Sequence, residues 1–241
     1  MKIIQYFFLF GFLSLPAIGQ KVDYRILSGF IFGAPIPDRV HMDSRGWPGL
    51  MPQAGMEMRF KISNPLQLSL GVLLSPKFAR FSSSFSDVIL EEKVIWIAGV
   101  PVDTAWIETF FSGKARGSFR NIYLEIPVRL ELKTGKWQIG AGPFLAPLLY
   151  ASNKVVAEGV VGFSVPPDST IRRMNHANLI RRWDYGISLA ASYKIFRKTE
   201  IYLHYHGSLP HIYSAEVEGL DGKLRNMNLS VGLNWSFSKR S

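Results

Sequence analysis

The chain has 241 residues, which is enough for one large core or one barrel but short for several domains. Hydrophobic residues make up 47% and charged residues 19%, which excludes a disordered chain, and the absence of cysteine excludes disulfides and thiolate chemistry. The formal net charge of +10 indicates contact with anionic lipid or glycan rather than nucleic acid, or simply a solvated surface.

The first segment has the pattern of a secretory signal peptide. Lys2 precedes an apolar run over residues 3–15, and small residues lead to a cleavage point near Gln20. The run is shorter than the ~20 apolar residues that span a bilayer. We therefore predict a signal peptide over residues 1–19 and one exported domain over residues 20–241.

In the rest of the chain, apolar and polar residues alternate with period two, whereas a helical period hardly occurs. The last segment is the clearest, and the first is the weakest because Leu27 and Ile31 blur its alternation. Pro127 withholds one backbone donor, which predicts a bulge or irregularity there. The eight predicted strands cover residues 23–34, 51–63, 66–79, 119–133, 137–150, 182–195, 200–208 and 223–238.

The connections between these strands alternate in length. Residues 64–65, 134–136 and 196–199 form tight turns, whereas residues 35–50, 80–118, 151–181 and 209–222 form long connections. An up-and-down antiparallel barrel that is elaborated at one end produces this rhythm, as outer-membrane barrels do.

The size of the polar-face residues indicates which face of the sheet is inside. An eight-stranded barrel has room for little more than its own side chains, so its inner face carries small residues. Gly186, Ser188 and Ala190 lie on the polar face of one strand, and Gly140 and Gly142 lie on that of another. The bulky apolar face is therefore predicted to contact lipid. A soluble lipid-carrying barrel, with the faces reversed, is the alternative.

Aromatic residues on the apolar face support the membrane orientation. They fall at two levels, as in the belts at membrane–water interfaces: Phe60, Trp137, Tyr193 and Trp235 near the tight turns, and Trp183 and Tyr185 near the long connections. The expected fold is all-β, an eight-stranded antiparallel up-and-down transmembrane β-barrel with short periplasmic turns and long outer loops. The expected location is the cell outer membrane.

Four stretches carry a family resemblance: YLEIPVRLEL (123–132), IGAGPFLAPLL (139–149), WDYGISLAASY (183–193) and NLSVGLNWSF (228–237). In these stretches the chain resembles the PorT-like outer-membrane β-barrel family of Gram-negative bacteria. The resemblance implies an integral outer-membrane protein. Some members of that family serve protein secretion or gliding machinery.

Charged residues on the predicted lumen face form the first candidate site. Buried charges persist only when they are paired, so we expect an ion-pair network that fills the barrel, with a proton or ion path as the alternative. An open solute pore needs about twice as many strands. The network residues are Glu57, Arg59, Glu125, Arg129, Glu131 and Asp184, with Lys61 and Lys133 on the same face.

The stretch HYHGSLPH (204–211) is the second candidate site. His206 and Ser208 share one strand face and form a possible base–nucleophile pair for an outer-membrane lipid hydrolase, with Glu216 or Glu218 as the orienting residue. His204 and His206 are also a possible metal pair that lacks an identified third ligand. The simpler interpretation is a polar lining of the lumen, without a catalytic residue, a metal or a cofactor.

Two long connections supply candidate interaction surfaces. Arg172, Arg173, Arg181 and Arg182 are predicted to contact lipopolysaccharide phosphates, which guanidinium groups bind in a bidentate manner. Residues 94–111 are too apolar for a free loop and predict a hairpin that extends beyond the bilayer. In that hairpin, Trp96 and Trp106 are expected to contact another envelope protein.

The sequence as a whole therefore predicts a non-enzymatic binding or assembly component of the cell envelope that acts through its outer loops. Outer-membrane lipid and lipopolysaccharide are the expected surroundings, and a further envelope protein is a possible partner. The lipid hydrolase and the soluble lipid carrier remain the alternatives.

Overall fold

The computed structural model describes residues 22–37, 44–97, 99–161, 168–214 and 224–237. The predicted signal peptide lies outside these residues. The elements are β1 (Val22–Pro37), β2 (Ser44–Lys61), β3 (Leu66–Ile97), β4 (Val100–Thr134), β5 (Trp137–Val161), β6 (Asp168–Asn175), the short 3-10 helix η2 (Ala177–Leu179), β7 (Trp183–Lys194), β8 (Thr199–His211) and β9 (Leu224–Ser236).

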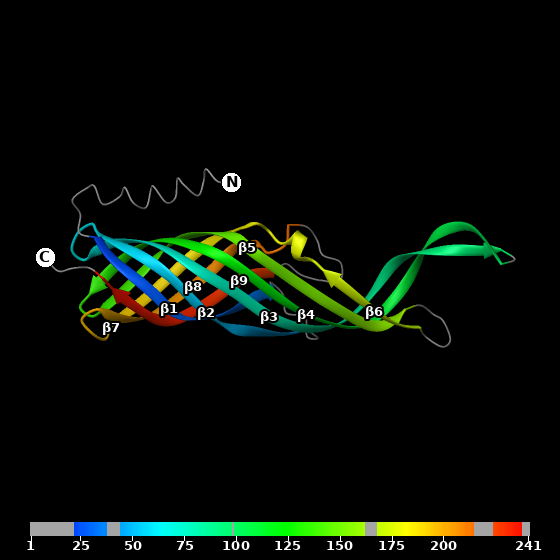
Figure 1. The fold of residues 1–241 in the computed structure, drawn as a ribbon, viewed down its shortest axis with the longest axis horizontal. Coiled ribbons are helices and arrows are strands. Elements are labelled where there is room, and N and C mark those ends of the chain that lie inside the picture. Colours follow the sequence, from blue (N-terminus) through cyan, green and yellow to red (C-terminus); the bar gives the residue numbers. More distant parts are fainter. Residues whose placement is uncertain (1–21, 38–43, 98, 162–167, 215–223, 238–241) are drawn as a thin grey trace.

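Eight of these strands close into an antiparallel ring (Figure 1). The order around the ring is β1, β2, β3, β4, β5, β7, β8 and β9, and β9 pairs with β1 to complete it. Every strand pairs with its neighbour along the chain except where β6, which pairs with β5 outside the ring, intervenes. The predicted eight-stranded up-and-down barrel is confirmed.

The two faces of the barrel wall point as the sequence predicts. On β7, Trp183 and Ile187 are each 52% exposed on the outer surface, whereas Asp184 and Ser188 are buried inside. The same apolar-out pattern runs along β9 and β8. An outer wall of this composition suits hydrocarbon, and a closed ring leaves no unpaired sheet edge within the bilayer. Of the helical segments that the structure describes, none has the length and hydropathy of a membrane-spanning helix.

The aromatic belts are largely as predicted. Trp137 and Trp235 are more than half exposed near the tight turns, and Trp183 and Tyr185 are about half exposed near the long connections. The ring of Trp137 lies against that of Tyr193, at 4.8 Å between centroids. Phe60 is the exception, because only 8% of it is exposed and it does not contribute to the belt.

An apolar cluster inside the barrel explains the blurred alternation of β1. Leu27 points inward and packs with Leu73 and Tyr202, and all three are buried. These large side chains occupy space that glycines leave free, since a Cβ added at Gly55 would lie 2.9 Å from Leu73 Cδ2. The lumen is therefore packed by apolar as well as polar side chains.

Part of the sheet continues beyond the barrel at the end with the long connections (Figure 1). β3 and β4 stay paired from Leu66–Leu132 out to Ile97–Val100. β2 is paired with β3 only as far as Ser83, and β5 is paired with β4 only as far as Phe111. The predicted hairpin is confirmed, and β6 adds a fourth strand to the base of this extension.

The outer end of the lumen holds an apolar plug, formed by Ala79, Phe119, Ile180, Ile212, Tyr213 and Leu224. The segments on either side of β7 and β8 meet there, because the Arg181 amide donates to the Ile212 carbonyl at 2.7 Å and the Ser214 amide donates to the Leu179 carbonyl at 2.8 Å. The plug closes the barrel over the inward-facing side chains of β4 and β9.

The irregularity predicted at Pro127 is an interruption of the β3–β4 pairing and not a bulge, because neither Pro127 nor Ile126 has a paired residue on β3. The β3–β4 register is the same on both sides of it, with Leu70 opposite Val128 and Leu73 opposite Glu125. The proline ring instead packs over Gly71, where an added Cβ would lie 3.1 Å from Pro127 Cγ. A glycine on the neighbouring strand makes room for the ring without a shift in register.

Candidate functional site

Arg59 is the centre of an ion-pair cluster near the short-turn end of the lumen. Its Nε lies 2.6 Å from Glu57 Oε1 and 3.0 Å from Glu131 Oε2. One terminal nitrogen lies 3.1 Å from Glu200 Oε2. Glu200 also pairs with Arg25, and Arg25 pairs with Asp23 at 2.7 Å. These contacts connect four strands of the ring, β1, β2, β4 and β8, including strands that are not neighbours in the sheet.

Arg129 enters the same cluster from β4. It pairs with Glu57 and lies 3.5 Å from Glu131 Oε1. Gln138 on β5 donates a hydrogen bond to Glu131 at 2.5 Å and another to Gln67 at 2.9 Å, and it accepts one from Arg59. Each buried charge therefore has an opposite charge or a hydrogen-bond donor beside it, which is the condition for burying charges at all.

Lys77 is the centre of a second cluster, nearer the plug. Its Nζ lies 3.2 Å from Glu125 Oε1 and 3.3 Å from Asp184 Oδ2. His206 Nδ1 lies 2.7 Å from the other Glu125 oxygen. Asn226 donates to Asp184 at 2.8 Å. The ammonium group also lies over the Tyr123 ring, 4.6 Å from its centroid.

All six predicted network residues lie in these two clusters. Glu57, Arg59, Arg129 and Glu131 share the first, and Glu125 and Asp184 share the second. Sequence reasoning missed four further members, Asp23, Arg25, Lys77 and Glu200. The alternation could have identified Lys77 and Glu200, because residues an even number apart on a strand face the same side. Lys77 is on the same side as Ser69 and Ser75, and Glu200 is on the same side as His204.

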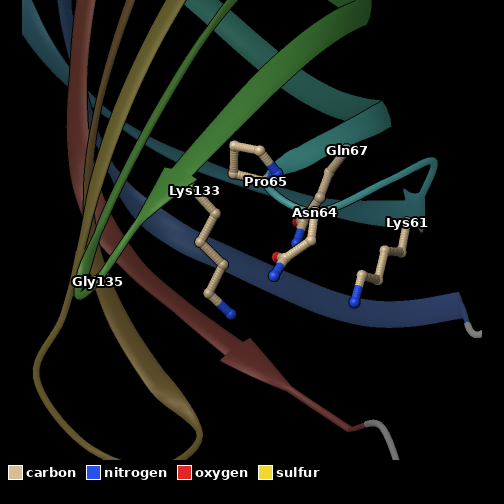
Figure 2. A pocket seen from close by; sticks show the side chains of 6 residues that line it. All are labelled: Lys61, Asn64, Pro65, Gln67, Lys133 and Gly135. Carbon is tan, nitrogen blue, oxygen red and sulfur yellow. The ribbon is translucent and has the colours of Figure 1, made fainter.

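Lys61 and Lys133 lie outside the buried network. Both are exposed at the short-turn mouth of the barrel, where they line an open vestibule of about 410 Å³ together with Asn64, Gln67 and the turn at Gly135 (Figure 2). Gln67 accepts the hydrogen bond from Gln138, so the vestibule leads directly to the Arg59 cluster. Lys61 and Lys133 lie near the ends of β2 and β4, where the inward-facing side of the wall opens to solvent. Alternation along the strand therefore assigned them to the lumen although they are exposed.

The predicted His206–Ser208 pair does not have the geometry of a base and a nucleophile. Ser208 donates its proton to Asp184 at 2.8 Å, while His206 lies against Glu125 and stacks on Phe144 at 5.1 Å. Both residues are at most 5% exposed inside the lumen. The proposed orienting residues Glu216 and Glu218 lie outside the described part of the chain.

His204 and His206 stack with parallel rings, 6.4 Å apart between centroids. Among the described residues, no group of three His, Asp or Glu side chains is arranged to hold a metal ion. Both imidazoles instead form part of a stack with Tyr202 and Phe144 along one side of the lumen.

The four predicted lipopolysaccharide-contact arginines separate into two groups. Arg172 and Arg173 lie in β6, and the Arg173 side chain is exposed. Arg181 and Arg182 lie beside the plug, where the Arg181 guanidinium donates to the Tyr213 carbonyl at 3.2 Å and the Arg182 carbonyl accepts from the Leu148 amide at 2.8 Å. The arginines therefore form no single cluster.

Trp96 and Trp106 lie on opposite strands near the end of the β3–β4 hairpin. Trp96 is opposite Pro101, and Trp106 is opposite Glu92. The two tryptophan positions are thus brought to the same projecting hairpin, far from the lumen clusters.

Solved structures of outer-membrane proteins resemble this fold at low sequence identity. Ail, the attachment invasion locus protein of Yersinia pestis, is 8% identical, with 90% of this chain and 99% of that chain covered and a TM-score of 0.38. OprG of Pseudomonas aeruginosa is 9% identical, with 91% and 98% covered and a TM-score of 0.37. The protease OmpT of Escherichia coli is 8% identical, with 93% and 100% covered and a TM-score of 0.32.

No functional conclusion follows from similarities at these values. A comparison with curated protein sequences found no match. Residues 20–214, which make up most of the chain, match the family described as outer membrane protein beta-barrel domain. The chain therefore belongs to the outer membrane protein beta-barrel domain family and is an integral protein of the outer membrane.

Proposed function

We propose that this protein is a non-enzymatic component of the cell envelope that binds another envelope protein through the β3–β4 hairpin. The proposal includes export by the signal peptide at residues 1–19. The observation that carries it is the continuation of paired strands well beyond the ring, out to Ile97–Val100. A barrel that served only as a membrane plug would have no use for this extension.

The length and composition of the hairpin suit protein binding. Beyond Phe111, where β5 ends its pairing, β4 continues for 11 residues to Val100, or about 35 Å at ~3.3 Å per residue. The sequence of residues 94–111 is mostly apolar. Large apolar stretches on extracellular elements commonly mark protein contact sites.

The lumen is filled with side chains, which supports a function that is performed outside the barrel interior. The Arg59 and Lys77 clusters fill two levels of the barrel with paired charges, and the apolar plug fills the outer end. The Ser208 proton is donated to Asp184, which argues against Ser208 as a nucleophile. These features favour binding over hydrolysis or solute passage.

The finer family assignment belongs to the same proposal. The stretches at 123–132, 139–149, 183–193 and 228–237 resemble the PorT-like family, and they lie in β4, β5, β7 and β9 of the ring. Because some members of that family serve secretion or gliding machinery, the partner is proposed to be a component of such an assembly.

Site-specific photo-crosslinking in cells tests the hairpin. A photoreactive residue is placed at Trp96 or at Trp106, and Trp137 on the short-turn aromatic belt is the matched control position. The same protein adduct is expected from both hairpin positions and not from Trp137. Absence of an adduct at both hairpin positions, or the same adduct from the control, would reject the proposal.

A further inference from the structure

We infer that the outward side of the base of the extension binds the phosphate groups of lipopolysaccharide in the outer leaflet. The surface, here called the cationic face, consists of Arg80, Lys114, Arg116, Arg120, Lys154 and Arg173, all of which are exposed. It draws residues from β3, β4, β5 and β6. Only Arg173 belongs to the arginine set that the sequence suggested.

Strand register places these side chains on one face. Directly opposed residues of an antiparallel sheet project to the same side. Arg116 is opposite Val156, and Val156 is opposite Arg173. In the next row towards the barrel, Arg80 is opposite Ser118, and Ser118 is opposite Lys154. The intervening residues are small or apolar, so the cations of separate strands form one continuous surface.

The cationic face lies immediately above the lipid-facing wall. Arg120 is two residues beyond the outward-facing Ile122, which is opposite the exposed Tyr150. Arg80 is opposite Trp47, which is 53% exposed. Aromatic residues of this kind lie at the membrane–water interface. The cations that follow within the next few residues are therefore at headgroup level in the outer leaflet.

The charge and spacing of the face suit a ligand with several phosphates. Glu158, opposite Lys114, is the only acidic side chain that the structure describes in these rows. Three strand spacings of ~4.8 Å separate β3 from β6, so the cations cover about 14 Å across the sheet. The guanidinium groups of Arg80 and Arg120 each lie 5.7 Å from the Phe78 ring centroid, which helps to hold both at the surface.

This inference is independent of the proposed protein partner. The cationic face is at the base of the extension, whereas Trp96 and Trp106 lie near its end. Arginine binds phosphate through paired hydrogen bonds, and a phosphorylated lipid is the anion that an outward-facing surface at this level meets. Loss of lipopolysaccharide binding and loss of a protein crosslink are thus separate results.

The test compares two triple variants of the full-length protein, purified from lipopolysaccharide-containing outer membranes in mild detergent. Arg116→Gln/Arg120→Gln/Arg173→Gln alters the cationic face. Lys136→Gln/Arg197→Gln/Lys198→Gln removes the same charge from exposed residues at the short-turn end. Lipopolysaccharide that copurifies per barrel, measured by mass spectrometry, is expected to fall at least fivefold in the first variant and to stay unchanged in the second.

A second measurement uses the unaltered protein in nanodiscs. Lipid A with its phosphates is expected to bind at least tenfold more tightly than dephosphorylated lipid A, and the difference is expected to shrink in high salt. Equal retention in the two triple variants, or equal affinity for the two lipids, would overturn the inference. So would displacement of lipid A by a soluble sulfated polysaccharide at lower concentration, since that result assigns the face to a free glycan.

Discussion

Arg129 on β4 and Glu57 on β2 form a buried ion pair although a whole strand, β3, lies between their backbones. The two residues are 0% and 1% exposed. Because a barrel brings inward side chains towards one axis, residues two strands apart meet there. The pair therefore stabilises the closed form of the sheet and not just one hairpin.

Loss of one member of this pair is expected to destabilise the barrel strongly. Arg129→Met leaves Glu57 and Glu131 with only Arg59 between them, and removal of one partner of a buried pair costs about 3–5 kcal/mol. Denaturant unfolding in lipid vesicles measures the change. Lys133→Met, on the same strand but exposed, is the matched control and is expected to change stability by less than ~0.5 kcal/mol.

A double substitution tests whether the pair is coupled. Glu57→Gln together with Arg129→Met removes both charges, so the loss of stability should be smaller than the sum of the two single losses. Strict additivity of the two single losses would mean that the residues act independently, and that the ion pair does not stabilise the closed ring.

The inner wall also depends on glycines that face large side chains. Gly232 on β9 is opposite Gly29 on β1, and an added Cβ at Gly232 would lie 2.8 Å from the Tyr202 hydroxyl and 2.2 Å from the Ser28 carbonyl oxygen. Gly232→Ala is therefore expected to lower the free energy of unfolding by about 1–3 kcal/mol. Gly46→Ala, where no atom lies within 4 Å, is the control. Similar unfolding midpoints for the two variants would contradict this explanation.

Sequence alternation was sufficient for the architecture because one parity carries small and polar residues in most strands. Asp184 and Ser188 on β7 were placed inside on that basis alone, and correctly. The alternation of polar and apolar residues failed as a guide where the lumen is apolar, since Leu27 points inward against Leu73 and Tyr202. Whether a side chain faces the lumen or the lipid depends on its size and on the space available inside the barrel, and its polarity is only an approximate guide.

The sequence could not predict which charged side chains pair with one another inside the lumen. Which charges meet depends on the stagger of the closed sheet, a property of the whole ring.

The cationic face was missed for a related reason. Arg80, Lys114, Arg116 and Arg120 fell in a region assigned to a connection, and they form one surface only because β3 and β4 stay in register well past the bilayer.

The lipid-hydrolase alternative makes a different prediction from the structure at Ser208. Since Ser208 donates to Asp184, Ser208→Ala should lower stability by about 1–3 kcal/mol, as for a hydrogen bond to a charged group, and should leave lipid turnover unchanged. Ser75→Ala is the comparison, because Ser75 is also buried but has no hydrogen-bond partner among the described residues. Loss of phospholipid or lipid A deacylation in the Ser208 variant alone would restore the enzyme hypothesis.

Tyr213 is a buried member of the apolar plug that combines ring packing with a hydrogen bond. Its ring lies 6.2 Å from that of Phe119, Asn153 donates to its hydroxyl, and burial raises the pKa of that hydroxyl, so it stays neutral. Tyr213→Ala removes the ring and is expected to release the neighbouring segment, so that added trypsin cuts at Arg181 or Arg182 several-fold faster in intact vesicles. Tyr213→Phe keeps the packing and should show a much smaller effect. An equal rise in cleavage rate in both variants would mean that the hydrogen bond from Asn153, and not the packing on Phe119, holds the outer end closed, and no rise in either would contradict the role given to Tyr213.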